Sequence, residues 1–591
     1  MSRLSVLILC AACLFPASAF AASPATKGPS LSVPLTKPIG ASTASGQSTS
    51  SEEPIPMAPS DVPPSGRRLS ANRVLVIADG LSKMRALRTE YPGSYGGAYL
   101  KGPSRWQVSY FTRGGKKEIG QVIIEETATS ARVLEQWTGF QVGWAMARGY
   151  PGAFGRHVNA LYIWLPLCLL FILPFFNLRR PFSLLHLDLL VLLSFSVSLA
   201  FFNHAHLYAS VPLSYPPLVY LLVRMLALLR RDRREPGPLR LRLLVPAPWL
   251  ALGVVFLLGF RIGLNVTDAN VIDVGYAGVI GAQRVVDGRP LYGAYPSENE
   301  HGDTYGPFNY EAYVPFQQIF GWSGRWDDLP AAHAASVFFD VLSVALLFLL
   351  GRRMRGPTLG VALAYAWVSY PFTLFALESN SNDTLLAALV LGALLAAGYR
   401  SKLALTARGG LVALAGLTKF APLALAPLMA THGLREMAPS RRPRAFALYL
   451  AAFAGTAALA LIPALGHDSL HTIYERTIAY QANRGSPFSV WGLYGLPGPQ
   501  RAVEIAAVAL ALALAVLPRR PDLVGLAAAC GAVILATQLG IEHWFYLYIP
   551  WFFPLVMLAL LGRFSDPSRP PAVVASEPAR WSRPALAQST G

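Results

Sequence analysis

The chain has little cysteine and little charge. Only 4 of its 591 residues are cysteine: Cys10 and Cys13 lie in the first apolar stretch, and Cys168 and Cys530 lie inside later apolar runs. Because all four cysteines lie in apolar runs, a disulfide framework is not expected. Charged residues amount to 14% of the chain, whereas hydrophobic residues amount to 53%. One soluble core cannot account for such a balance, so the composition predicts a polytopic membrane protein.

Acidic residues are the scarcer of the two charges. The chain has 32 Asp and Glu against 50 Lys and Arg, which gives a formal net charge of +18 at pH 7. A basic excess can indicate nucleic-acid binding, but here much of the arginine lies in short segments between apolar runs. That placement is typical of the cytoplasmic loops of membrane proteins, so no nucleic-acid partner is expected. The chain also lacks a GxxxxGK[ST] loop, and a nucleoside triphosphate site is therefore not indicated.

The first residues have the pattern of an export signal. Residues 1–22 combine a basic start at Arg3, an apolar stretch and small residues that fit an A-x-A cleavage site. We predict a cleaved signal peptide; an uncleaved anchor and a lipoprotein box ending at Cys13 are the alternatives. Residues 23–67 are rich in Ser, Thr, Pro, Gly and Ala. Because such a segment cannot bury a core, we expect a disordered linker.

Residues 68–155 predict a small exported α+β domain. Apolar residues spaced three and four apart indicate one face of an amphipathic helix: Val74, Ile77, Leu81, Met84 and Leu87. Trp106, Val108 and Tyr110 then alternate, and β-rich runs follow at 119–126 and 131–137. The segments WQVSYFTRGGKKEIGQVIIEE and VLEQWTG resemble the PepSY-like extracytoplasmic domain. No catalytic constellation is visible in it, so we expect a packing or ligand-sensing role.

Long apolar runs fill the rest of the chain. Because a membrane helix needs about 20 largely apolar residues, we predict about eleven full spans. They lie at 158–177, 184–203, 207–229, 243–261, 333–351, 357–377, 383–399, 444–464, 503–517, 521–540 and 543–562. The predicted fold is thus a polytopic α-helical membrane protein, with N-terminal membrane helices at 156–241, a core at 242–562 and a disordered tail at 563–591.

The apolar run at 409–431 differs from the others. Lys419, Pro422 and Pro427 interrupt it, and a lysine at the centre of a membrane helix costs about 2.5–3.5 kcal/mol on insertion scales. We interpret the run as a re-entrant hairpin with Lys419 near its tip, since irregular backbone at that depth is tolerated only inside protein or beside a wet cavity.

The arginine residues in every second connection predict how the chain is oriented in the plasma membrane. With the N-terminal domain exported and the hairpin accepted, the basic connections all face the cytoplasm, as does the C-terminus. These connections contain Arg179 and Arg180, residues 230–242, 352–355 and 400–408, Arg435 to Arg444, and Arg519 with Arg520. The polar, aromatic-rich connections then collect on the outer face, at 265–332, 378–382, 465–502 and 541–542.

The outer connections carry the residues on which we expect chemistry. Asp268 and Asp273 lie in TDANVID, directly after an apolar run. Acids and amides bind sugar hydroxyls, and flat aromatic rings cover the apolar faces of a pyranose. Lys419, Arg484 and His543 are candidates to hold a phosphate, the arginine in a bidentate way and the lysine as a point charge.

The order of these motifs resembles the GT-C membrane glycosyltransferases, which take sugars from polyprenyl-phosphate carriers. The stretch DGRPLYGAYP followed by YGPFNYEAYVPF is similar to the family 87 branch, which is largely mannosyltransferase-like, and GLTKFAPLALAPL resembles the broken lysine-bearing segment of many GT-C enzymes. In the superfamily an acid in the first large external loop is the catalytic base, and Asp268 has the matching position. The chain has TDAN where many relatives carry two adjacent acids, so Asp273 stays the alternative.

The resemblance implies a hexosyltransferase that moves a sugar such as mannose from a polyprenyl-phosphate donor to an envelope glycan or glycolipid. We expect sugar or acceptor contacts from polar residues of the outer loops, namely Tyr305, Asn309, Glu311, Asn380 and Asn382. No cofactor and no metal are indicated. Two other classes remain open from the residues alone: a transporter or flippase of lipid-linked sugars with Lys419 in its path, and a sensor that couples the PepSY-like domain to the membrane part.

Overall fold

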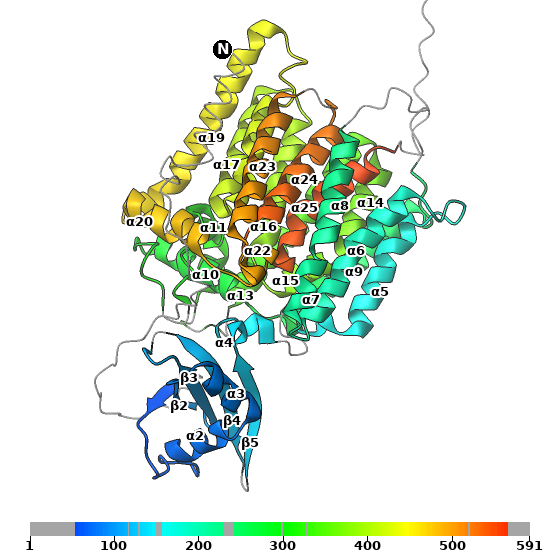
Figure 1. Ribbon diagram of the computed structural model, residues 1–591. Coiled ribbons are helices and arrows are strands. Elements are labelled where there is room, and N and C mark those ends of the chain that lie inside the picture. Colours follow the sequence, from blue (N-terminus) through cyan, green and yellow to red (C-terminus); the bar gives the residue numbers. More distant parts are fainter. Residues whose placement is uncertain are drawn as a thin grey trace, which may run out of the picture.

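The computed structural model describes residues 54–564, except residues 116, 128–129, 149–155, 230–240, 297–298, 323, 325, 327–328 and 518–519. A small N-terminal domain of strands and two helices adjoins one end of a large helical bundle (Figure 1). This arrangement confirms the predicted fold class. The predicted signal peptide, most of the predicted linker and nearly all of the predicted tail lie outside the described residues.

The N-terminal domain is an antiparallel sheet covered by helices. Its five strands pair in chain order: β1 (Ile55–Met57), β2 (Tyr95–Lys101), β3 (Arg105–Phe111), β4 (Glu118–Glu126) and β5 (Ala131–Thr138). Trp106, Val108 and Tyr110 alternate along β3 and are fully buried against the helices. The period-two pattern therefore identified the core face of the central strand.

Two features of this domain differ from the predictions. The single predicted helix is broken into α2 (Ala71–Asp79) and α3 (Ser82–Glu90), because the chain turns at Gly80. The domain also begins before residue 68: β1 pairs with β2, and Arg67 donates a 2.5 Å hydrogen bond to the carbonyl of Gly102. A three-residue edge strand that contains a proline has almost no compositional signal. The sequence therefore predicts a linker for this segment.

The bundle contains seven described helices that are long and apolar enough to cross a membrane, or eight if the bent pair α14 and α15 forms one span. They comprise α6 (Leu184–Phe202), α7 (Leu207–Leu213) with α8 (Tyr215–Leu228), α9 (Ala247–Asp268), α13 (Pro330–Met354), α14 (Pro357–Ser369) with α15 (Pro371–Glu378), α19 (Arg442–Leu465), α23 (Pro497–Val516) and α24 (Leu523–Gly540). Shorter apolar helices are α5 (Leu161–Ile172), α16 (Asp383–Ala397) and α25 (Ile549–Leu561). The total of about eleven spans stays a prediction.

The segment predicted as a hairpin turns back on itself. Helix α17 (Lys402–Thr418) ends directly before Lys419, and the chain returns through η5 (Ala421–Leu425) and α18 (Ala426–Thr431). Arg408 of the outgoing arm donates a 3.3 Å hydrogen bond to the carbonyl of His432 at the end of the returning arm. The two arms therefore lie side by side, and Lys419 lies at the turn.

The connections gather at the two ends of the bundle as expected. At one end Arg353 donates to the carbonyl of Gly398, and Arg355 donates to that of Gly562. The other end carries the short helices α10 (Asp273–Val286), α11 (Pro307–Glu311), α12 (Val314–Phe320), α20 (Leu470–Tyr474), α21 (Tyr480–Asn483) and α22 (Val490–Tyr494). The N-terminal domain lies against this second end (Figure 1).

A buried charge pair joins four helices of the bundle. Arg261 of α9 is fully buried and binds Asp340 of α13 at 2.6 and 3.2 Å. Trp367 of α14 donates to the same carboxylate at 2.8 Å, and Thr373 of α15 accepts from Arg261 at 3.2 Å. Such a pair is tolerated in an apolar interior because both charges are matched and hydrogen-bonded.

Replacing Asp340 with alanine should strongly destabilise the bundle. The variant leaves Arg261 buried without its counter-ion, which costs about 3–5 kcal/mol, so the apparent unfolding temperature in detergent should fall by several degrees. The control is Arg132→Ala, because Arg132 pairs with Glu125 at 3.4 Å on an exposed strand. Equal unfolding temperatures for the two variants would contradict the importance of the buried pair.

Candidate functional site

The segment that leads into α10 is held by the loop after α15. The amide of Asn270 donates to the carbonyl of Glu378 at 3.3 Å, and the amide of Ile272 donates to that of Ser379 at 3.2 Å. The side chain of Asn380 completes this contact by donating to the carbonyl of Asn270 at 3.0 Å. Two stretches more than a hundred residues apart in sequence thereby fix where α10 begins.

Close packing at Gly275 reinforces this contact. A side chain on Gly275 would collide with the carbonyl oxygen of Asn380. Asn380 itself has a backbone φ of 49°, in the left-handed region that asparagine tolerates better than most residues. The first turn of α10 can therefore approach the loop only because residue 275 is glycine.

Asp273 is the first residue of α10. A carboxylate is favoured there by the positive end of the helix dipole, and its backbone carbonyl accepts a 2.9 Å hydrogen bond from Asn299. The side chain has access to solvent although many protein atoms surround it, and it is not among the residues that line the cavity described next. Burial raises the pKa of Asp273, whereas the positive charges of Arg484 and, more weakly, Lys419 oppose that rise.

A cavity of about 240 Å³ lies between the hairpin turn, the loop around α21 and the segment before α25. Its lining is formed by Thr304, Tyr305, Lys419, Phe420, Ala421, Gln481, Ala482, Arg484, Gln500, Glu504, Ile541, Glu542, His543, Tyr548 and Trp551. All three residues predicted to hold a phosphate are in this set. Among the described residues, no three His, Cys, Asp or Glu side chains are placed to hold a metal ion.

Lys419 is held at the hairpin turn by a carboxylate and by aromatic rings. Its Nζ lies 2.5 Å from Oδ1 of Asp383, the first residue of α16, and Trp551 donates to the same oxygen at 2.8 Å. The Nζ also lies 5.0–5.7 Å from the ring centroids of Trp551, Tyr548 and Tyr305. The ammonium group is thus charge-compensated and enclosed by aromatic faces.

Arg484 and His543 present a second pair of nitrogen groups to the cavity. The guanidinium of Arg484 lies 5.1 Å from the ring centroid of Trp144, and no described carboxylate forms an ion pair with it. His543 bonds to Ser486 through Nδ1 at 2.9 Å. Burial, followed by the positive charges of Arg484 and Lys419, lowers the pKa of His543 well below its usual value. The imidazole is therefore neutral at pH 7 and acts as a hydrogen-bonding group.

The two long loops that carry these residues are tied together. Arg476 binds Asp303 in a bidentate way, with Nε–Oδ2 at 2.7 Å and Nη2–Oδ1 at 2.9 Å. The rings of His301 and Tyr480 stack nearby at 4.8 Å. These contacts bring the segment of Tyr305 next to the segment of Arg484, so that the two loops form one surface.

Asp268 has different surroundings from Asp273. It ends α9, and its carboxylate binds both the ring and the backbone amide of His157, at 2.7 and 3.1 Å. His157 belongs to η2 (Arg156–Asn159), which precedes α5. Asp268 therefore binds the segment that connects the N-terminal domain to the bundle. The positive charges of Arg484 and Lys419, in contrast, act on Asp273.

The residues expected to contact a sugar lie in two environments. Tyr305 lines the cavity. Asn309 and Asn382 are fully buried and bond to each other at 2.5 Å, and Asn380 bonds within the loop described above. Glu311 is partly buried at the end of α11, where burial raises its pKa to about 7. The three asparagines are thus buried and hydrogen-bonded within the fold, and their contact with a sugar stays a prediction.

Two residues of the site escaped the sequence reasoning. Asp383 could have been found from the general rule that a lysine inside a membrane bundle needs a counter-ion, because it directly follows the predicted outer connection at 378–382. Trp144 could not, since nothing in the local pattern connects the end of the N-terminal domain with residues more than three hundred positions later. Its ring nevertheless contacts both Arg484 and His543.

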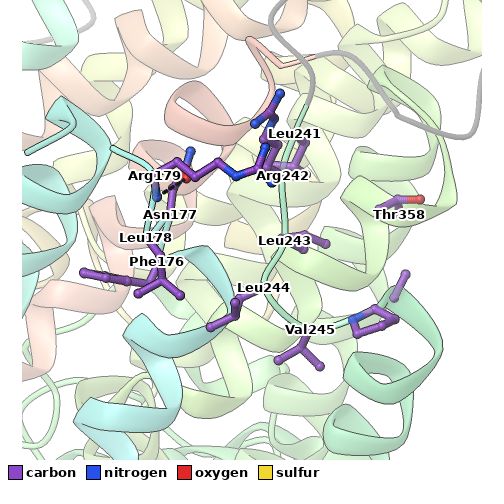
Figure 2. A pocket seen from close by; sticks show the side chains of 12 residues that line it. Phe176, Asn177, Leu178, Arg179, Leu241, Arg242, Leu243, Leu244, Val245 and Thr358 are labelled. Carbon is purple, nitrogen blue, oxygen red and sulfur yellow. Dashed lines mark hydrogen bonds between the residues drawn. The ribbon is translucent and has the colours of Figure 1, made fainter. Parts of the chain in front are cut away.

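A larger cavity of about 580 Å³ lies at the arginine-bearing end of the bundle. Figure 2 shows the side chains that line it, with Arg179 on the left, Arg242 near the centre and Thr358 on the right. Its other lining residues are mainly apolar, and none of those described is a carboxylate. Because no described carboxylate lines this cavity, the smaller cavity lined by Lys419, Arg484 and His543 is the stronger candidate for chemistry.

Comparisons with known proteins show what this chain is similar to. The model of glycosyltransferase family 87 matches residues 304–540, which include the cavity residues from Thr304 to Glu504. Among solved structures, the chain is similar to ArnT from Cupriavidus metallidurans bound to undecaprenyl phosphate, with 17% identity and a TM-score of 0.34. That match covers 54% of this chain and 60% of ArnT. No curated protein matches the chain.

Replacing Gly275 with alanine should displace α10 and lower the stability of the protein. The new Cβ meets a backbone oxygen that cannot move without breaking the contacts of the loop after α15. The matched control is Gly263→Ala in α9, where a Cβ meets nothing within 4 Å. We expect the unfolding temperature to fall for Gly275→Ala and to stay unchanged for Gly263→Ala. Equal unfolding temperatures would show that the close approach is not required.

Proposed function

We propose that this chain is a membrane glycosyltransferase that takes its sugar from a polyprenyl-phosphate donor, and the match of residues 304–540 to the model of glycosyltransferase family 87 supports this. The sugar is a hexose such as mannose, and the acceptor is a glycan or glycolipid of the cell envelope at the outer face of the plasma membrane. The observation that carries the proposal is that Lys419, Arg484 and His543 line one cavity, and that the charges of Arg484 and Lys419 act on the carboxylate of Asp273.

The reaction needs one base and one site for the leaving group. A hydroxyl oxygen of the acceptor attacks the anomeric carbon, its proton passes to the carboxylate of Asp273, and the bond between the anomeric carbon and the phosphate oxygen breaks. The polyprenyl phosphate leaves with the bonding electron pair. A positioned general base contributes about 10²–10⁴-fold to such a step.

Three groups of the cavity suit a departing phosphate. Arg484 suits it best, because its guanidinium forms no ion pair with a described carboxylate and offers two parallel N–H donors. Lys419 adds a positive charge that it shares with Asp383. His543 is neutral and contributes a hydrogen bond. Together they stabilise the negative charge that develops on the leaving oxygen.

The walls of the cavity suit a lipid-linked substrate. Tyr305, Tyr548 and Trp551 supply aromatic faces, and Gln481 and Gln500 supply amides for sugar hydroxyls. The cavity also adjoins the hairpin and α25, which belong to the apolar helices of the bundle. A polyprenyl chain among these helices brings its phosphate to the end of the bundle that carries Asp273.

Replacing Asp273 with asparagine should lower kcat/KM for sugar transfer by about 10²–10⁴-fold, because the amide cannot accept the proton. The measurement is transfer of labelled sugar from a polyprenyl-phosphate sugar by the purified protein in lipid. Asp268→Asn is the matched variant, and most of its activity should remain, since its carboxylate binds His157. Loss of activity in Asp268→Asn with retention in Asp273→Asn would move the catalytic base to Asp268.

The acidic limb of the pH profile should depend on Arg484. The base works only when unprotonated, so activity is present above the pKa of Asp273 and is lost as the pH falls through it. Arg484→Gln removes the main charge that holds this pKa down, and the limb should therefore move to higher pH in addition to a lower maximal rate. Arg289→Gln, an exposed control, should leave the limb in place. An unmoved limb in Arg484→Gln would contradict Asp273 as the titrating base.

A further inference from the structure

Trp144 links the N-terminal domain to the cavity. It lies between α4 (Phe140–Gly143) and η1 (Ala145–Arg148), in the connector that follows β5. Although it belongs to the N-terminal part of the chain, its half-buried side chain packs against the core of the helical bundle. The indole therefore crosses the boundary between the two parts of the protein.

Three residues of the bundle converge on this one ring. The guanidinium carbon of Arg484 lies 5.1 Å from the ring centroid of Trp144. The imidazole of His543 stacks on it at 5.4 Å and 29°, and Phe488 contacts its edge at 5.1 Å and 64°. Arg484 and His543 are two of the three groups that suit a leaving phosphate, and both pack against the ring of Trp144.

The connector is itself anchored to the sheet of the N-terminal domain. Arg148 donates to the side chain of Gln121 in β4 at 2.8 Å and to the carbonyls of Gln141 and Val142 at 3.0 and 3.1 Å. It also forms a 3.6 Å ion pair with Glu135 in β5. The backbone on both sides of Trp144 is therefore tied to the domain, and the position of the domain determines the position of the indole.

We propose that Trp144 is a positioning residue of the donor-phosphate site, so that the exported domain supplies part of the glycosyltransferase site. The guanidinium carbon of Arg484 lies over the indole ring, and no described carboxylate forms an ion pair with its N–H groups, so that they can bind phosphate in a bidentate way. The stacked His543 is held by Trp144 on one side and by Ser486 at Nδ1. This inference rests on the proposed function and adds a role for the N-terminal domain.

A binding experiment on the full-length protein in lipid nanodiscs tests the proposal, with a polyprenyl monophosphate as the probe. Trp144→Ala should weaken binding about 3- to 30-fold, the range expected from loss of a cation–π contact that orients Arg484. Trp144→Phe keeps an aromatic face and should recover most of the affinity. Trp249→Ala is the control, because Trp249 is 67% exposed on the first turn of α9, and it should bind as the unmodified protein does.

A double-mutant cycle separates positioning from a general loss of structure. If Trp144 acts through Arg484, then Trp144→Ala should change the affinity less than twofold when Arg484 is already glutamine, although each change alone weakens binding. Unfolding temperatures of all variants show whether each one is folded.

Three results would overturn the proposal. Normal binding by Trp144→Ala would refute the role of Trp144 and leave the proposed function intact. Fully additive effects of the two substitutions would show that Trp144 does not act through Arg484. Failure of the unmodified protein to bind the polyprenyl monophosphate would refute the proposed donor, and the role of Trp144 with it.

Discussion

The ion pair between Lys419 and Asp383 is the contact on which the candidate site depends. An ammonium group among apolar helices is costly unless a carboxylate compensates it, and Asp383 at the start of α16 does so at 2.5 Å. The pair holds the tip of the broken hairpin against α16, and Trp551 ties α25 to the same carboxylate. One wall of the cavity exists because these three elements meet there.

The rest of the site depends on contacts between loops. The loop after α15 binds the segment before α10 through Asn270 and Ile272, and the bidentate pair of Arg476 with Asp303 ties the two outer loops. Asp273 and Arg484 reach the same region by these routes. The site thus combines residues from the hairpin, three loops and, through Trp144, the N-terminal domain, and its geometry follows from the whole fold.

Much of this fold could be predicted from the sequence because its strongest signals are local. Apolar runs indicated the helices, the interruption at Lys419 indicated the hairpin, and the alternation of Trp106, Val108 and Tyr110 indicated the central strand. The choice between Asp268 and Asp273 had no local signal. Both acids lie at helix ends only a few residues apart, and what distinguishes them is that His157 binds the first whereas Arg484 acts on the second. Each partner comes from a distant part of the chain.

The most direct test of the account is a density map of the protein with a polyprenyl monophosphate bound. The account predicts the phosphate within about 3 Å of the N–H groups of Arg484 and Lys419, with the carboxylate of Asp273 facing the position of the sugar. A phosphate bound beside Asp268, or in the cavity of Arg179 and Arg242 at the other end of the bundle, would contradict it.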